Sequence, residues 1–171
     1  MTKTALVVVD MQRYYLDRGS PFVRYFEQVS PGSMGYIMAR CSATVIPNIR
    51  VLACEFRKRS LPVFYLRLCG SDPRRMDLHR FFRESWRQAV ESGFADIYPL
   101  KSDPMADVAM DIQPQWGDPV INKTTFSAFT SAGFEKRLSE AKVDCLVFTG
   151  LATSQCVETT ARDASDRGYG I

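Results

Sequence analysis

The sequence predicts a three-layer α/β fold with a mostly parallel sheet. Two observations lead to this fold class: short apolar runs rich in β-branched residues alternate with longer segments of helical periodicity, and no repeat or linker divides the chain. The chain has 171 residues and is 46% hydrophobic, which suits one domain with one sizeable core. We therefore expect residues 1–171 to form a single domain.

The first half of the chain predicts a β-α-β unit. Residues 5–9 (ALVVV) are typical of a strand buried on both faces, and Asp10 follows them directly. Residues 41–59 carry apolar side chains at helical spacing and end in three basic residues, which suit a helix C-terminus. Residues 61–66 (LPVFYL) predict the second strand.

The second half predicts two more strands, each followed by a helix. The segment 70–117 looks like an insertion over the sheet, with one helix and a proline-containing connection. Residues 169–171 resemble the start of a further strand. Two alternatives follow: the domain lacks a C-terminal strand and helix here, or its sheet has an unpaired edge. The predicted helices are 78–88, 133–141 and 154–167, and the predicted strands are 119–122 and 145–149.

Composition and charge favour a cytoplasmic protein that acts on a small molecule. The formal net charge of +3 arises from 22 basic and 19 acidic residues without a block of like charge, so we expect no nucleic-acid partner. No apolar run approaches the ~18 residues that span a bilayer, and the first residues do not resemble a signal peptide. The five cysteines form no CxxC pair, which suits a reducing compartment.

His79 is the only histidine, so the chemistry has to proceed without a histidine base. Its apolar and basic neighbours look like one face of a helix, and we expect a surface or packing role for it. We predict no metal site and no cofactor.

Three chemically active residues follow predicted strands, where ligands bind in open α/β sheets. Asp10 and Lys123 come directly after the strands at 5–9 and 119–122, and Cys156 lies in the first turn of the last helix. A helix N-terminus and a nearby lysine lower the pKa of a thiol, so we expect a reactive Cys156. Three alternatives stay open: Asp10 as a loop cap, Lys123 as a solvated charge and Cys156 as an inert core thiol.

Three segments resemble the signatures of the isochorismatase-like cysteine hydrolase superfamily in order and spacing. They are residues 5–12 (ALVVVDMQ), 122–129 (NKTTFSAF) and 150–163 (GLATSQCVETTARD). The resemblance implies a Rossmann-like α/β/α fold and a catalytic triad of Asp10, Lys123 and Cys156. It also implies a non-proline cis peptide at Leu151-Ala152, with the N–H groups of Ala152 and Cys156 as an oxyanion hole.

The resemblance further implies a cofactor-free hydrolase that cleaves a small amide or ureide C–N bond through a thioester. Isochorismatases proper typically carry glycine where this chain has Cys156, and nicotinamidases use a metal site with several histidines. Both observations favour the branch that acts on N-carbamoyl compounds, ureidoacrylate, biuret-like molecules or other small amides. The alternatives are vinyl ether hydrolysis and a non-catalytic α/β scaffold. A homo-oligomer is expected from the family.

Five residues are candidates for substrate binding because they lie near the proposed triad in sequence or at a strand end. Each has a plain alternative, such as core packing for Tyr15 or a surface position for Arg67. The candidates are Tyr15, Arg67, Phe126, Thr153 and Gln155.

Overall fold

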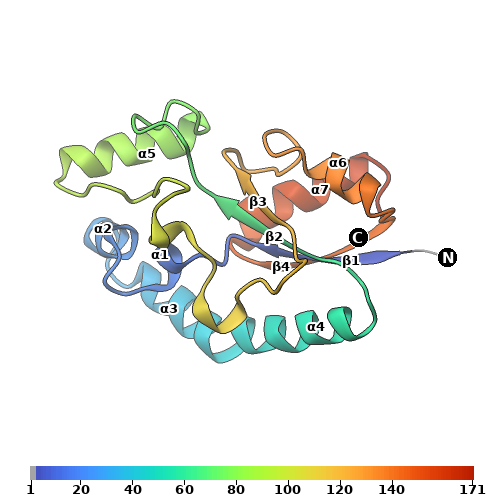
Figure 1. The fold of residues 1–171 in the computed structure, drawn as a ribbon. Coiled ribbons are helices and arrows are strands. Elements are labelled where there is room, and N and C mark those ends of the chain that lie inside the picture. The colour runs from blue at the N-terminus through green and yellow to red at the C-terminus, as the bar shows by residue number, and fades with distance from the viewer. Residues whose placement is uncertain (1–2) are drawn as a thin grey trace.

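A computed structural model describes residues 3–171 and contains, in that range, a four-stranded parallel sheet with helices on both faces (Figure 1). The strand order is β3-β2-β1-β4, and every neighbouring pair is parallel. The predicted fold class is therefore confirmed. The strands are β1 (Thr4–Val9), β2 (Val63–Leu68), β3 (Val120–Lys123) and β4 (Cys145–Gly150).

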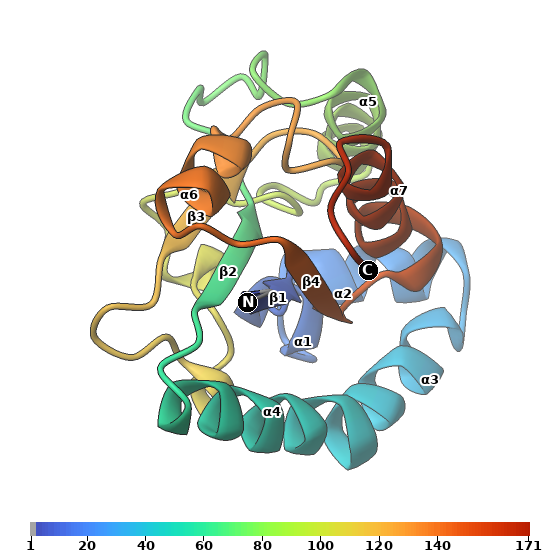
Figure 2. The same ribbon diagram turned by 90° about the vertical axis from the view of Figure 1, so that its right-hand side faces the viewer.

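The alternation of side chains along β1 divides the core into two parts. Ala5, Val7 and Val9 belong to one buried cluster, whereas Leu6 and Val8 belong to the other. Helix α4 (Ile46–Lys58) covers the second face, and α6 (Phe134–Glu140) and α7 (Glu158–Asp166) cover the first (Figure 2). Burial on both faces explains why the strand is a continuous apolar run.

The remaining helices surround one end of the sheet (Figure 1). Residues 13–40, for which the sequence predicted no element, form three of them. The helices are α1 (Arg13–Leu16), α2 (Pro21–Val29), α3 (Ser33–Arg40) and α5 (Arg80–Glu91). Short 3-10 turns span Pro104–Ala106 and Met110–Ile112. Turns of π-helix span Cys41–Val45 and Thr153–Val157.

Helix α2 begins with a pattern that the sequence prediction missed. Ser20 is its N-cap and accepts a hydrogen bond from the N–H of Val23 at 3.1 Å, and Pro21 occupies the first helical position. Both residue types favour a helix start at these positions. The buried residues Phe22 and Tyr25 then pack the helix against the core.

The predicted helix at 41–59 is longer than expected, because α3, a π-helical turn and α4 form one helical stretch, Ser33–Lys58. By length and composition this stretch could cross a membrane. Its residues Met34, Met38, Ile49 and Ala53 belong to the two buried core clusters.

The chain's last residues lie beside β4. Gly170 forms a parallel bridge with Cys145, and its carbonyl accepts a hydrogen bond from the N–H of Leu146 at 2.8 Å. That a further strand starts here stays a prediction.

Gly150 allows the end of β4 to approach β1 closely. Its φ is +108°, and an added Cβ would overlap the carbonyl oxygen of Val9. Leu151 also donates a backbone hydrogen bond to that oxygen at 3.1 Å. Only glycine satisfies both the positive φ and the close approach.

We therefore expect Gly150→Ala to destabilise the domain by at least about 2 kcal/mol more than Gly32→Ala does, measured by urea denaturation. Gly32 is the matched control, because its φ is +83° but an added Cβ would meet no atom within 4 Å. Equal losses for the two variants would contradict the steric explanation.

Candidate active site

The three predicted catalytic residues come together at the carboxyl ends of the strands. Asp10 follows β1, Lys123 ends β3, and Cys156 lies in the π-helical turn after β4. Their exposed fractions are 1%, 0% and 3%, so the group is shielded from bulk water.

Lys123 lies between the acid and the thiol. Its Nζ is 2.8 Å from Oδ2 of Asp10 and 3.2 Å from Sγ of Cys156, and it donates a third contact to the carbonyl of Thr125 at 3.1 Å. The contact with Asp10 is an ion pair by distance. Within residues 3–171 neither carboxylate oxygen receives a well-aligned hydrogen bond. The carboxylate thus keeps capacity to accept a proton.

The pKa values of this group differ from the expected pattern. Burial raises the pKa of Cys156 far above its ordinary value, Asp10 raises it further, and Lys123 opposes both. Burial lowers the pKa of Lys123, but Asp10 and Cys156 raise it above its ordinary value. The expectation of a thiol with a lowered pKa was wrong, because burial and the carboxylate outweigh the lysine. The resting site therefore holds a protonated thiol and a charged ammonium.

Gln12, which ends the first signature segment, holds the site's framework together. Its side chain accepts a hydrogen bond from the N–H of Leu68 at 2.7 Å and donates to the carbonyl oxygens of Leu68 and Ala106 at 3.2 and 2.8 Å. The loop that carries Asp10 is thereby fastened to the end of β2.

Ser127 and Asp163 connect the segments that carry Lys123 and Cys156. The hydroxyl of Ser127 donates to Oδ2 of Asp163 at 2.6 Å, and Arg167 donates to the other carboxylate oxygen at 2.8 Å. Both partners lie within the signature segments, but the sequence did not predict the link between them. The link fixes the turn after β3 against helix α7.

The backbone after β4 has the cis peptide that the resemblance implied, at Leu151-Ala152. The carbonyl of Ala152 accepts hydrogen bonds from Gln155 and Val157 at 3.0 and 3.3 Å. Ala152 and Cys156 both line the cavity described below. Their role as an oxyanion hole stays a prediction.

A cavity of about 370 Å³ opens beside Asp10 and Cys156. Three of the five substrate-binding candidates line it, namely Tyr15, Thr153 and Gln155. The sequence did not predict the rest of its wall, because that wall comes from helices α2, α3 and α5 and from residues near 98. The buried or partly buried apolar side chains of that wall include Phe22, Phe26, Met34, Ile37, Phe82 and Tyr98.

The other two candidates, Arg67 and Phe126, do not line this cavity, so the structure does not bring them together with the first three. Arg67 binds Asp107 Oδ1 at 2.6 Å and Asn122 Oδ1 at 2.9 Å, because its position in β2 directs it toward the neighbouring strand β3. Phe126 packs against the rings of Phe81 and Phe82, with centroids 5.5 and 4.5 Å away. It supports the cavity wall from behind.

His79 has a structural position, as expected. It is exposed, it is the N-cap of α5, and its Nδ1 accepts a hydrogen bond from the N–H of Phe81 at 3.2 Å. In the described part of the chain, no three His, Cys, Asp or Glu side chains cluster so as to hold a metal ion.

Together these features define a class of protein: a parallel α/β domain with an acid, an ammonium and a thiol buried at the ends of its strands. The family model described as the isochorismatase domain matches residues 4–171, and the chain belongs to the isochorismatase family.

Curated relatives include two ureidoacrylate amidohydrolases named RutB. That of Pseudomonas syringae pv. syringae (strain B728a) is 31% identical over 175 residues, which cover 98% of this chain and 66% of the relative. That of Pantoea ananatis (strain LMG 20103) is 30% identical over 183 residues, with coverage of 94% and 63%. This chain therefore spans less than two thirds of the length of these relatives.

Solved structures with the same fold include an N-carbamoylsarcosine amidase from Thermoplasma acidophilum. It has a TM-score of 0.71 and 27% identity, covering 98% of this chain and 79% of that one. A cysteine hydrolase from Pseudomonas syringae pv. phaseolicola 1448A has a TM-score of 0.73 and 25% identity, covering 98% and 68%.

The opposing charges around Cys156 predict opposite pKa changes in two variants. Asp10→Asn removes a charge that raises the thiol pKa, so the apparent pKa should fall; Lys123→Met removes a charge that lowers it, so the apparent pKa should rise. The rate of iodoacetamide alkylation of Cys156 at one neutral pH, which rises with the thiolate fraction, measures both changes; Cys156→Ala is the blank.

Circular dichroism checks that each variant is folded. Each single variant leaves one buried charge without its partner and could fail to fold for that reason. The double variant Asp10→Asn/Lys123→Met removes both charges, so it should fold even if a single variant does not. Its apparent pKa should lie between those of the two single variants. Shifts of the same sign in both single variants would contradict the assignment.

Proposed function

We propose that this domain is a cysteine-dependent hydrolase that cleaves the C–N bond of a small amide or ureide through a thioester. The observation that carries this proposal is the position of the Lys123 ammonium, 2.8 Å from Asp10 and 3.2 Å from Cys156 beside a cavity. The names of the relatives, which are amidohydrolases and an amidase, support the same class of reaction.

The first step needs a base because the thiol is protonated at rest. Asp10 accepts the proton of Cys156 while Sγ attacks the substrate carbonyl carbon, so that a C–S bond forms and the carbonyl π electrons move to oxygen. The N–H groups of Ala152 and Cys156 donate hydrogen bonds to that oxyanion. Lys123 remains charged and balances the negative charge as it moves from carboxylate to oxyanion.

The second step breaks the C–N bond. The oxyanion returns its electrons, the amine or ammonia leaves, and protonated Asp10 donates its proton to the leaving nitrogen. Water then attacks the thioester with Asp10 again as base, the acid is released, and Cys156 recovers its proton. One carboxylate thus serves as base and as acid in turn.

Replacing either reacting residue should abolish turnover. We expect Cys156→Ala and Asp10→Asn to lower kcat/KM for a verified amide by at least about a thousandfold, since each removes a group required for acylation. Ammonia release measured by a coupled assay is the readout.

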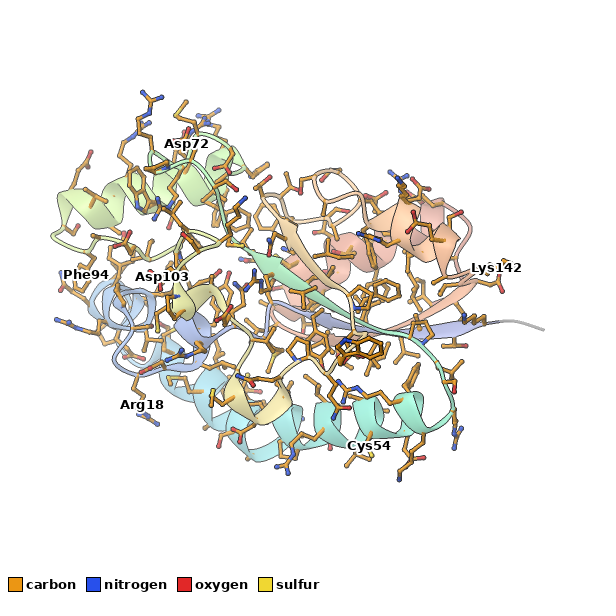
Figure 3. The ribbon with its side chains drawn as sticks, viewed as in Figure 1. Arg18, Cys54, Asp72, Phe94, Asp103 and Lys142 are labelled. Atoms are coloured by element: carbon orange, nitrogen blue, oxygen red, sulfur yellow. The ribbon has the colours of Figure 1, made fainter. Side chains whose placement is uncertain are left out.

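Cys54→Ala is the matched control, because Cys54 is exposed on α4, away from the sheet (Figure 3). This variant should keep the wild-type rate. Near wild-type turnover by folded Cys156→Ala would refute the proposal.

The proposed mechanism uses only side chains and backbone groups of this chain. We therefore expect dialysis against a chelator to leave kcat/KM unchanged, measured with the same ammonia assay. A loss of activity that added metal ions restore would show that the mechanism is incomplete.

A further inference from the structure

The Lys123 ammonium lies between three partners, one of which is a backbone carbonyl. Its Nζ is 2.8 Å from Oδ2 of Asp10 and 3.2 Å from Sγ of Cys156, and it donates to the carbonyl oxygen of Thr125 at 3.1 Å. An ammonium carries three N–H donors, so the carbonyl of Thr125 completes its set of partners. Lys123 is 0% exposed, and bulk water cannot replace a partner that moves away. The position of Thr125 therefore helps to decide where the ammonium lies.

Thr125 belongs to the irregular segment 124–133, which connects β3 to α6. Such a segment has no regular ladder of backbone hydrogen bonds, so its side chains largely fix its conformation. The hydroxyl of Thr125 donates to the carbonyl oxygen of Ser127 at 2.8 Å and lies 2.6 and 2.7 Å from the hydroxyls of Thr130 and Ser131. Thr125 and Ser127 thus form one turn, and a shift of Ser127 moves the carbonyl that binds the ammonium.

Helix α7 fastens this turn through two side chains. The hydroxyl of Ser127 donates to Oδ2 of Asp163 at 2.6 Å. The hydroxyl of Thr160 donates to the carbonyl oxygen of Cys156 at 2.7 Å and lies 3.4 Å from the carbonyl oxygen of Phe126. Because Cys156 lies in the π-helical turn that leads into α7, the same helix anchors both the thiol and the turn that holds the ammonium.

The carboxylate of Asp163 is a charged acceptor outside the cavity. One of its oxygens accepts from Ser127, and the other accepts from Nε of Arg167 at 2.8 Å. Partial burial acts to raise the pKa of Asp163, but the hydrogen bonds from Ser127 and Arg167 lower it below its ordinary value, so the group is ionised at neutral pH. A hydrogen bond to an ionised acceptor is short and strong. Neither Ser127 nor Asp163 lines the cavity beside Cys156, so the link is not part of the substrate's wall.

We propose that Asp163 is a positioning residue of this active site, which acts through Ser127 on the turn that holds the Lys123 ammonium. This inference rests on the proposed function and adds a residue to it. Without the hydrogen bond to Ser127 the carbonyl of Thr125 shifts, and the ammonium spends less time beside Sγ of Cys156. The positive charge then favours the thiolate less.

The first experiment measures the reactivity of the thiol in Asp163→Ala. We expect iodoacetamide to alkylate Cys156 at least about threefold more slowly than in the wild type at one neutral pH, followed by mass spectrometry of the peptide that contains it. Two other effects of the substitution have the opposite sign. Loss of a negative charge by itself favours the thiolate, and looser packing exposes the thiol, so both speed alkylation. An equal or faster rate would therefore overturn the inference.

A conservative variant and a matched control separate the hydrogen bond from the surface charge. Asp163→Asn keeps an oxygen that accepts from Ser127, so its alkylation rate should stay within about twofold of the wild-type rate. Glu135→Ala removes the other carboxylate that Arg167 binds, at 2.7 Å, and leaves the link to Ser127 in place, so it should react at the wild-type rate. A rate as slow as that of Asp163→Ala in either variant would refute the role of this hydrogen bond.

A double-mutant cycle tests whether the two residues act through one link. Ser127→Ala removes the other partner, and it should slow alkylation by about the same factor as Asp163→Ala. The double variant should react no more slowly than either single variant, because all three have lost the same hydrogen bond. Slowing that multiplies in the double variant would contradict the inference. Circular dichroism checks folding, and Ser127→Ala gives the same comparison if Asp163→Ala does not fold.

Turnover of a verified amide separates positioning from substrate binding. Asp163→Ala should lower kcat by at least about threefold and keep KM within about twofold, because the carboxylate does not line the cavity. A raised KM with unchanged kcat would assign Asp163 to substrate binding and overturn the inference. If the wild type hydrolyses no amide, the proposed function fails, whereas the alkylation rates still decide whether Asp163 positions the ammonium.

Discussion

The buried ammonium of Lys123 is the interaction on which the rest of the site depends. An ion in a protein interior costs several kcal/mol unless its partners compensate, and removing one partner of such a pair typically costs about 3–5 kcal/mol. Here the partners are Asp10, the thiol of Cys156 and the carbonyl of Thr125, all within 3.2 Å. The same arrangement that satisfies the buried charge therefore places a carboxylate beside a thiol, the two groups that the proposed mechanism uses as base and nucleophile.

The sheet topology is what brings these groups into contact. In the order β3-β2-β1-β4, Lys123 and Asp10 lie two strand spacings apart, about 10 Å between backbones, and the long lysine side chain spans part of that distance. Gln12 fastens the end of β1 to β2, and Gly150 brings the end of β4 against Val9. The Ser127–Asp163 hydrogen bond then connects the segments that follow β3 and β4.

The distribution of charge around the cavity differs from that within the triad. The triad concentrates one cation and one anion in a buried space, whereas the adjoining wall from α2, α3 and α5 is mainly apolar. A low-polarity wall strengthens the electrostatic interactions of the triad, because little water screens them. Burial also raises the thiol pKa, so in the proposed mechanism the thiolate forms only as the proton moves to Asp10.

The sequence by itself determined the fold class and the strands, because buried parallel strands are continuous apolar runs. It also placed Asp10, Lys123 and Cys156 at or shortly after the ends of these strands, where polar residues are recognisable. It predicted Tyr15, Thr153 and Gln155 beside the cavity but not its wall. Only the tertiary structure decided that wall, the position of Arg67 outside the cavity and the raised thiol pKa. Each of these features depends on which distant segments pack together and on how completely they exclude water. The local periodicity of a sequence does not specify long-range packing.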